Sequence, residues 1–522
     1  MERARYLARD RTIHVLDGPT CMKRLLLLPA IALATFLPAQ QNVLLVVADD
    51  LGLDPVPGYL SGPQKATMPT LASLMDDGLT FDQAWASPVC SPTRATIITG
   101  RTGIETGVLG VDTLNTLLPS ETTLFEFLDQ QGSGHAMSLI GKWHLGGTQP
   151  ALDDPAQQGV PHFTGILGGG VQNYFSWPQV TNGTLTPNTD YITEVLTDSA
   201  IAWINGQAQP WLCWLAYNAP HSPFHLPPAH LHTQGNLPTD SASIAADPLP
   251  YYLAMVESLD SELGRLLAAI PPAVLANTTI VFIGDNGTPG EVIQSPYQPN
   301  RAKGTFYQGG VHVPLVISGA GVTRQGEREP APVVSTDLFA TLAELTGEAL
   351  PVYASSKSLV PLLTQGGLSH RDCLRVDAQS LQGVGSATRE ARYKLITLGN
   401  GNERFYDLQD DPYEATNLLF GGLTAQEQDA YDVLSEGCAS ITGIAARDAD
   451  EQVSIYPNPT TGTLLLEGLT ERQTIHVMDL LGQVVLSANV GSGTGRVDLG
   501  HLAPGTYVLH GNGFSRLVVV QR

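Results

Sequence analysis

The hydrophobic positions of the chain follow two recurring patterns. The first is a continuous apolar run that stops abruptly at a polar residue. Asn42 to Ala48 leads into Asp49, Thr279 to Gly284 leads into Asp285, and Trp211 to Tyr217 forms a weaker run of the same kind. Continuous apolar runs of this length are typical of strands that are buried on both faces of a sheet.

The second pattern is an apolar periodicity close to that of an α-helix, and it fills the segments between these runs. It predicts helices over residues 69–77, 122–130, 191–205 and 251–270. Strands that alternate with helices indicate an α/β sheet with helices on both faces. Because ligands bind beyond the carboxyl ends of the strands in open α/β sheets, the polar residues after the runs are expected to form a site.

The pattern changes twice toward the C-terminus. Short strands at 393–397 and 404–408, followed by a helix-like stretch after Ala425, predict a smaller α+β subdomain. Beyond a polar linker at 447–451, strands separated by Gly and Pro turns predict a small all-β sandwich. The chain is too long for one compact core, and we expect an α/β domain at 40–368, an α+β subdomain at 369–446 and a β-sandwich at 452–522.

The N-terminal segment has the pattern of a signal peptide. Met22-Lys23-Arg24 precedes an apolar run from Leu25 to Phe36, and Pro38-Ala39 follows it, which predicts cleavage after Ala39. The run is too short for a permanent membrane span, and a buried core helix is the alternative. We expect Met22 to be the true start, so that residues 1–39 are a dispensable leader and signal peptide.

The composition is that of a folded globular protein, with 43% hydrophobic and 15% charged residues. The formal net charge of -23 repels phosphate backbones and anionic lipid surfaces, so nucleic acid is not an expected partner. A local basic pocket could still hold a small anion.

The chain has five cysteines, and four of them have simple interpretations. Cys21 lies in the leader, and Cys213 stands in an apolar run where a buried core thiol is expected. Cys373 and Cys438 could form a disulfide in an oxidising compartment. Cys90 needs another explanation.

The residues after the apolar runs suggest a metal site. Asp49, Asp50, Asp285 and Asn286 offer oxygen ligands that suit Ca²⁺ first and Mg²⁺ second, although a strand-to-turn cap is an alternative for Asp49 and Asp50 alone. Cys90 opens a stretch that resembles the start of a helix, which is a natural seat for an anion. A soft thiolate is mismatched with such a hard cation.

The segment that begins at Cys90 resembles a motif of a known protein family. Cys90-Ser91-Pro92-Thr93-Arg94, followed by Thr99-Gly100-Arg101, is similar to the hallmark of the type I sulfatases, in which the Cys is oxidised to formylglycine. The resemblance covers residues 42 to 440 and implies an alkaline-phosphatase-like α/β fold. Five further segments agree in order: Asp49 to Gly52, Gly141 to Gly146, Pro220 to Phe224, Gly284 to Gly287, and Lys303-Gly304 with Gly309 to Pro314.

The resemblance also implies roles for residues. Asp49, Asp50, Asp285 and Asn286 would bind Ca²⁺ together with an oxygen of the modified Cys90, whose hydrated aldehyde supplies the nucleophile. The remaining catalytic and substrate-binding residues would be Arg94, Lys142, His144, His221 and Lys303.

Each of these side chains has an implied task. Arg94 would hold the modified residue, while Lys142 and Lys303 would bind sulfate oxygens. His221, with Lys303, would protonate the departing alcohol, and His144 would act as the base that accepts a proton from the modified residue.

The last 70 or so residues resemble another family. Tyr456-Pro457-Asn458-Pro459, Asp479 to Gln483 and Leu502 to Tyr507 are similar to the C-terminal sorting domain of the type IX secretion system. This resemblance implies export across the outer membrane and release or attachment at the cell surface. An ordinary carbohydrate-binding sandwich is the alternative.

The sequence therefore predicts an exported sulfatase that hydrolyses sulfate monoesters of aryl or carbohydrate compounds and depends on a formylglycine-generating maturation enzyme. A phosphonate monoester hydrolase or phosphodiesterase of the same superfamily is one alternative, and a catalytically silent protein that binds sulfated glycans is another. The loops at 165–170 and 174–177 either line a sugar or aryl pocket or pack into the core.

Overall fold

A computed structural model describes residues 40–112, 114–349, 355–436 and 454–521, the last range without 458–459, 470–471, 479–483 and 512–513. The predicted leader and signal peptide at 1–39, the linker at 447–451 and Cys438 lie outside the described residues.

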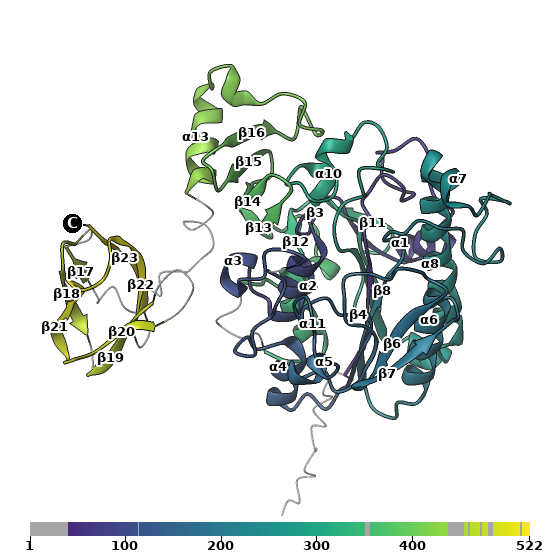
Figure 1. Ribbon diagram of the computed structural model, residues 1–522, viewed down its shortest axis with the longest axis horizontal. Helices are drawn as coiled ribbons and strands as arrows, with labels where there is room; N and C mark the ends of the chain where they lie inside the picture. The colour runs from purple at the N-terminus through teal and green to yellow at the C-terminus, as the bar shows by residue number, and fades with distance from the viewer. Residues whose placement is uncertain are drawn as a thin grey trace, which may run out of the picture. The chain divides into compact units, whose positions relative to one another are not determined.

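A ten-stranded mixed sheet forms the centre of the α/β domain (Figure 1). Its five central strands, β9, β1, β8, β4 and β5, run parallel. The three apolar runs of the sequence are strands of this sheet, which confirms the predicted fold class. The strands in spatial order are β11 (Glu327–Glu329), β2 (Gly78–Phe81), β10 (Leu315–Gly319), β9 (Thr278–Gly284), β1 (Asn42–Ala48), β8 (Trp211–Tyr217), β4 (Ala136–Lys142), β5 (Phe163–Ile166), β6 (Trp177–Thr181) and β7 (Thr184–Asn188).

Strand β1 shows why these runs are continuously apolar. Its alternate residues belong to two different cores: Val43 and Val47 pack into one, and Leu44 and Val46 into the other. Burial on both faces leaves no position where a polar side chain reaches water.

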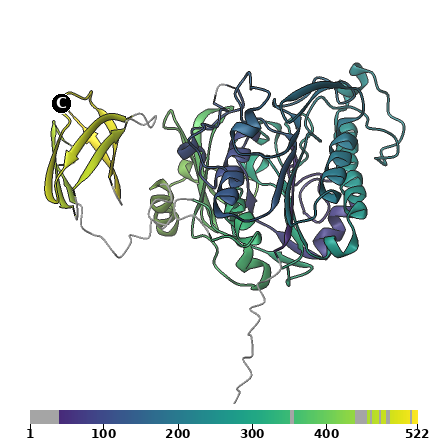
Figure 2. The ribbon, with the colours of Figure 1, turned by 90° about the horizontal axis from the view of Figure 1, so that it is seen from below.

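Helices cover both faces of the sheet (Figures 1 and 2). One face carries α2 (Cys90–Thr99), α4 (Leu124–Gln131) and α11 (Asp337–Leu345), and the other carries α1 (Pro69–Asp76), α6 (Ile192–Asn205) and α8 (Leu249–Ala269). The four predicted helices are therefore confirmed as α1, α4, α6 and α8, with bounds that differ by one or two residues. The shorter elements are α3 (Gly103–Thr106), α5 (Asp154–Gln157), α7 (Ser241–Ala246), α9 (Pro272–Leu275), η1 (Pro299–Arg301), α10 (Gln308–Val311), α12 (Val360–Thr364), and the pair β3 (Ala84–Trp85) and β12 (Val333–Val334).

A four-stranded antiparallel sheet forms the smaller subdomain, as predicted. Trp85 and Tyr307 of the α/β domain share a hydrophobic core with Val376, Ile396 and Tyr406 of this sheet. The subdomain is thereby fixed beside the carboxyl ends of the central strands. Its elements are β13 (Leu374–Ser380), β14 (Gly383–Arg389), β15 (Tyr393–Leu398), β16 (Glu403–Asp407), η2 (Leu418–Phe420) and α13 (Ala425–Ser435).

The C-terminal segment consists of two small antiparallel sheets that share one core, in which Leu464 and Leu466 of the first sheet pack with Ile475 and Leu509 of the second. One sheet contains β17 (Ser454–Tyr456), β18 (Thr463–Leu469) and β21 (Gly493–Asp498); the other contains β20 (Val484–Val490), β19 (Gln473–Met478), β22 (Gly505–Gly511) and β23 (Phe514–Val520).

Candidate active site

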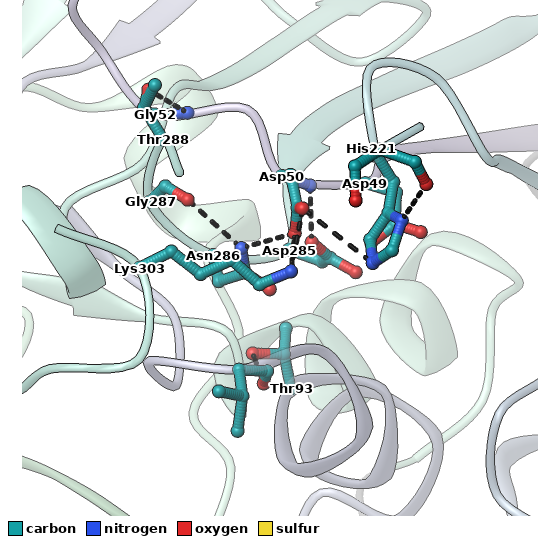
Figure 3. Close-up of polar contacts among 12 residues, drawn as sticks. Asp49, Asp50, Gly52, Thr93, His221, Asp285, Asn286, Gly287, Thr288 and Lys303 are labelled. Atoms are coloured by element: carbon teal, nitrogen blue, oxygen red, sulfur yellow. Dashed lines mark hydrogen bonds and ion pairs between the residues drawn. The ribbon is translucent and has the colours of Figure 1, made fainter. Parts of the chain in front are cut away.

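The ends of β1 and β9 bring four predicted metal ligands together. Ala48 and Gly284 are register partners, so the residues that follow them leave the sheet side by side. The backbone amide of Asp50 donates to Asp285 Oδ1 at 3.0 Å, and Asn286 Nδ2 donates to Asp50 Oδ1 at 2.8 Å (Figure 3). These contacts hold the two strand ends in a fixed geometry.

The donor atoms at this place fit a hard cation. Asp49 Oδ1 and Asn286 Oδ1 are fully buried oxygens that have no hydrogen-bond partner among the described residues. Buried oxygens without a partner are costly unless something positive binds them. One ligand atom each from Asp49, Asp50, Cys90 and His221 lies within 4.8 Å of the others. Carboxylate and amide oxygens are the ligands that Ca²⁺ prefers.

Cys90 is the first residue of helix α2, as the sequence predicted. It is 2% exposed, and the residue before it, Val89, provides no side-chain cap for the helix. The first turn of α2 therefore presents backbone N–H groups with the polarity that favours an anion. Burial raises the pKa of the Cys90 thiol to about 12, with Lys142 acting against the shift.

Three cationic side chains surround the acidic cluster. Arg94, one turn into α2, donates to Asp285 Oδ2 at 2.8 Å and to the backbone oxygen of Lys142 at 2.9 Å. Lys142 Nζ donates to Asp49 Oδ2 at 2.6 Å, and Lys303 Nζ lies 2.6 Å from the Asp50 carboxylate. Three positive charges thus face three carboxylates, and an added divalent cation would leave the site positive and attractive to an anion.

The ionisation of the cluster follows from this pairing. Burial favours the neutral carboxyl, but Lys142, with smaller effects from His221 and Arg94, holds the pKa of Asp49 well below its usual range. Burial and the adjacent Asp49 carboxylate raise the pKa of Asp285 to about 7. Burial also disfavours the Lys303 ammonium, yet Asp50 raises its pKa above the usual value.

Lys142 is the last residue of strand β4, and its position depends on the glycine before it. Gly141 has φ 116°, and a Cβ at this position would lie 1.8 Å from the backbone oxygen of Ala216 in β8. Only glycine allows this approach without backbone movement. The close contact places Lys142 beside the end of β1.

His144 is held as a neutral imidazole. Its Nε2 lies 3.0 Å from the backbone oxygen of Val111, so the proton on Nε2 is donated there and the lone pair remains on Nδ1. Nδ1 is buried and has no hydrogen-bond partner among the described residues. Burial, with the charges of Lys142 and Arg94, lowers the pKa of His144 to about 2.

His221 also borders the acidic cluster. Its Nδ1 donates to the backbone oxygen of Ser222 at 2.7 Å, and its Nε2 lies 3.8 Å from Asp50 Oδ2. The side chain is 21% exposed and can reach a ligand from the solvent side.

The glycine-rich loop contacts both histidines. A Cβ on Gly169 would lie 2.6 Å from the His144 ring, and a Cβ on Gly170 would lie 3.2 Å from the His221 ring. The loop is therefore part of the site wall, and its backbone leaves no room for further side chains there.

A hydrogen-bond network behind the cluster was not predicted from the sequence. Thr288 Oγ1 accepts from the backbone amide of Gly52 at 3.2 Å and donates to Asp54 Oδ1, and the Tyr252 hydroxyl donates to the backbone oxygen of Asp50 at 2.8 Å. Burial raises the pKa of Asp54 to about 6, although Thr288 opposes the shift. A hydroxyl residue two positions after Asn286 is the only sequence signal for this network.

Three other histidines and the 174–177 stretch have partners outside the cluster. The His225 ring lies tilted against that of Tyr174 with centroids 4.2 Å apart, His230 pairs with Glu194 on the surface, and His312 Nε2 donates to the backbone oxygen of Asp82. In the 174–177 stretch, Tyr174 and Trp177 are buried, whereas Phe175 is 39% exposed, so this stretch contributes to both the core and the surface.

Two cysteines also have defined surroundings. Cys213 is a fully buried free thiol, as predicted. Cys373 is disulfide-bonded, and its pairing with Cys438 stays a prediction because Cys438 lies outside the described residues.

Two family models match the chain. Residues 41–348 match the sulfatase model, and residues 454–520 match the secretion system C-terminal sorting domain. The second match indicates export by the type IX route. Among the described residues, the helices are either too short or too polar to cross a bilayer.

Named relatives agree with the first match. The chain is 30% identical over 338 residues to the uncharacterized sulfatase YdeN of Escherichia coli, which covers 58% of each chain, so it spans little more than half of that protein. It is 29% identical over 464 residues to human arylsulfatase A, covering 78% of this chain and 89% of the relative. The fold matches BT4656, solved with its substrate D-glucosamine-2-N,6-O-disulfate, at a TM-score of 0.65 and 20% identity over 79% of this chain and 99% of that one. Because the sulfatase model covers more than half of the chain and matches the part that carries the cluster, this protein belongs to the sulfatase family of sulfuric ester hydrolases.

Proposed function

We propose that this protein hydrolyses sulfate monoesters with Cys90 converted to formylglycine and with Ca²⁺ bound by Asp49, Asp50, Asp285 and Asn286. The observation that carries the proposal is the convergence of Cys90 with the two acidic strand ends, next to three cationic side chains. The hydrated aldehyde would supply an oxygen nucleophile in place of sulfur, and Ca²⁺ would offset negative charge beside it.

The chain's own side chains have complementary tasks in this proposal. Lys142 and Lys303 bind the oxygens of the sulfate group, a role supported by their ammonium groups, which border the acidic cluster through Asp49 and Asp50. Arg94 holds the modified residue through its position one turn along α2. Their combined charge stabilises a transition state in which negative charge builds up on sulfate oxygens and on the departing oxygen.

Two histidines divide the proton transfers. His221 reaches the ligand from the solvent side and, with Lys303, protonates the departing alcohol or phenol oxygen. His144 Nδ1, which has a free lone pair, takes a proton from the modified residue and so permits release of sulfate.

Export completes the proposal. The segment at 1–39 acts as leader and signal peptide, and the C-terminal segment is read by the type IX secretion machinery, which places the enzyme at the cell surface or outside the cell. A formylglycine-generating enzyme is the required maturation partner.

The test is to produce the protein together with a formylglycine-generating enzyme and to establish the state of Cys90 by peptide mass spectrometry. Turnover of 4-nitrophenyl sulfate is then compared with turnover of bis(4-nitrophenyl) phosphate. We expect preference for the sulfate, loss of activity on chelation and recovery with Ca²⁺. Cys90→Ala should lower kcat by at least about 10³-fold, whereas Cys213→Ala, which alters the other buried free thiol, should keep kcat.

Two results would contradict the proposal. Preference for the phosphodiester would favour the related phosphonate monoester hydrolases and phosphodiesterases. An unmodified Cys90 in protein from the native host would favour a silent protein that binds sulfated glycans.

A further inference from the structure

Two exposed apolar side chains are anchored directly to the candidate active site. Val111 is 40% exposed, and its backbone oxygen accepts the hydrogen bond of His144 Nε2. Leu381, at the tip of the β13–β14 hairpin, is 81% exposed, and its backbone amide donates to the oxygen of Gly304 at 2.7 Å. Gly304 directly follows Lys303, so Leu381 stands beside the lysine that binds sulfate in the proposed function.

Phe175 is a third exposed apolar side chain, and it follows a residue that contacts the site. It is 39% exposed, and its ring lies 5.0 Å from that of Tyr191 and 5.7 Å from that of His225. The hydroxyl of the preceding residue, Tyr174, donates to the backbone oxygen of His221 at 2.6 Å. Val111 bonds His144 through its backbone, Leu381 bonds the residue after Lys303, and Phe175 follows the residue that bonds His221. We call these three side chains the apolar rim.

The segment that carries Val111 and Phe175 has almost no positively charged residues. Between Arg101 and Arg265 the sequence has one Lys or Arg, which is Lys142. Lys142 is fully buried and paired with Asp49. The loops that carry Val111 and Phe175 therefore bring no further cation to the rim.

The basic side chains nearest in sequence to Leu381 and Lys303 are engaged elsewhere. Arg375 binds Asp377 at 2.7 Å, and Arg389 donates to Gln83 at 2.8 Å. The guanidinium groups of Arg301 and Arg404 lie 4.6 and 6.0 Å from the ring of the buried Tyr307. In the described part of the chain, Arg94, Lys142 and Lys303 each pair with a carboxylate of the cluster, so the excess positive charge available to a substrate would be that of the proposed Ca²⁺, which is enough for one sulfate group.

We infer that the site selects esters whose leaving group has no second anionic group, namely aryl sulfates and singly sulfated neutral sugars. A second sulfate or a carboxylate on the leaving group would lose water against the apolar rim without gaining a cationic partner, which is unfavourable. The flat face of an aryl or sugar ring would instead pack on these side chains. The net charge of -23 adds a long-range penalty for polyanions. This inference rests on the proposed function.

The test compares two matched substrates on the matured enzyme with Ca²⁺: N-acetylglucosamine 6-sulfate and glucosamine 2-N,6-O-disulfate. We expect kcat/KM for the singly sulfated sugar to be higher by at least about tenfold. Leu381→Lys places a cation at the rim and should shift the ratio toward the disulfate by about tenfold. Leu185→Lys, at a 52% exposed leucine on the edge strand β7, is the matched control and should leave the ratio unchanged.

The outcomes separate this inference from the proposed function. Equal or faster turnover of the disulfate by the unaltered enzyme would overturn the inference and leave the sulfatase assignment intact. An identical change of ratio in both leucine variants would also overturn it, because the effect would then come from overall charge. Absence of turnover of every sulfate ester, with Cys90 shown to be modified, would overturn the proposed function and the inference with it.

Discussion

Thr288 Oγ1 accepts a hydrogen bond from the backbone amide of Gly52 at 3.2 Å, across 236 residues of sequence (Figure 3). Gly52 lies two residues after Asp50, and Thr288 lies two residues after Asn286. A single hydroxyl therefore links the two loops that carry the candidate metal ligands, and it sets their separation through one bond to the backbone and one to Asp54.

Replacing this hydroxyl should weaken metal binding. Thr288→Val keeps the shape of the side chain but leaves the Gly52 amide and the Asp54 carboxyl without this partner. Residues that orient metal ligands typically contribute about 10- to 100-fold to metal affinity, so we expect the Kd for Ca²⁺, measured by titration calorimetry on metal-free protein, to rise by that factor. Thr288→Ser retains the hydroxyl and should restore binding. A Kd unchanged in the valine variant would contradict this role.

The glycine loop should be sensitive to substitution at Gly169 and tolerant at the position before it. In Gly169→Ala the new Cβ would lie 2.6 Å from the His144 ring, so the ring must move away from the Val111 carbonyl. A displacement of this size should lower kcat by about 10- to 100-fold. Gly168→Ala is the control, because a Cβ there meets nothing within 4 Å. Equal kcat values for the two variants would show that the position of His144 does not matter.

Burial of His312 should make stability depend on pH. Burial lowers its pKa to about 3, and its Nε2–H donates to the Asp82 carbonyl, so the folded state holds a neutral ring. The unfolded chain, with a pKa near 6.5, binds a proton first as the pH falls, so the stability contributed by His312 is complete above about 6.5 and declines toward pH 3. Denaturant titrations should therefore show that the free energy of unfolding falls less between pH 6.5 and 4 in His312→Gln than in the unaltered protein. His230→Gln, at an exposed position, should show the same fall in the free energy of unfolding as the unaltered protein.

The C-terminal segment should matter for export and not for chemistry. Its two sheets have a hydrophobic core of their own. Deletion of residues 452–522 should leave the purified enzyme with unchanged kcat/KM but trap it inside the outer membrane of the native host. Cell fractionation and activity assays check the two halves of this prediction separately, and normal export of the shortened chain would contradict the sorting role.

Much of the α/β domain was predictable because its signals are local. Strands β1 and β9 are uninterrupted apolar runs, and the acids that follow them mark the end of each strand. Strand β4 was not predicted, because Ser138 and Gly141 interrupt its apolar run. The position of Lys142 at its end was therefore indicated only by the resemblance to known sulfatases. The order of the strands was also beyond prediction, since parallel neighbours need not be consecutive in sequence.

The contacts that position the site were harder to predict than its residues. Val111 acts on His144 through a backbone oxygen, and no side-chain pattern marks such a role. Thr288 and Gly52 meet only after the sheet has formed. The exposed Leu381 looks like an ordinary hairpin residue until the subdomain packs beside Lys303.

The ion pairs of Lys142 with Asp49 and of Lys303 with Asp50 affect the order in which the protein folds and binds metal. Buried carboxylates need a counter-ion, and here the chain provides its own. The strand ends can therefore close before a metal ion is bound, and the proposed Ca²⁺ would be needed for turnover and not for assembly. A chain built in this way would reach the cell exterior already folded, and the proposed Ca²⁺ would then start turnover there.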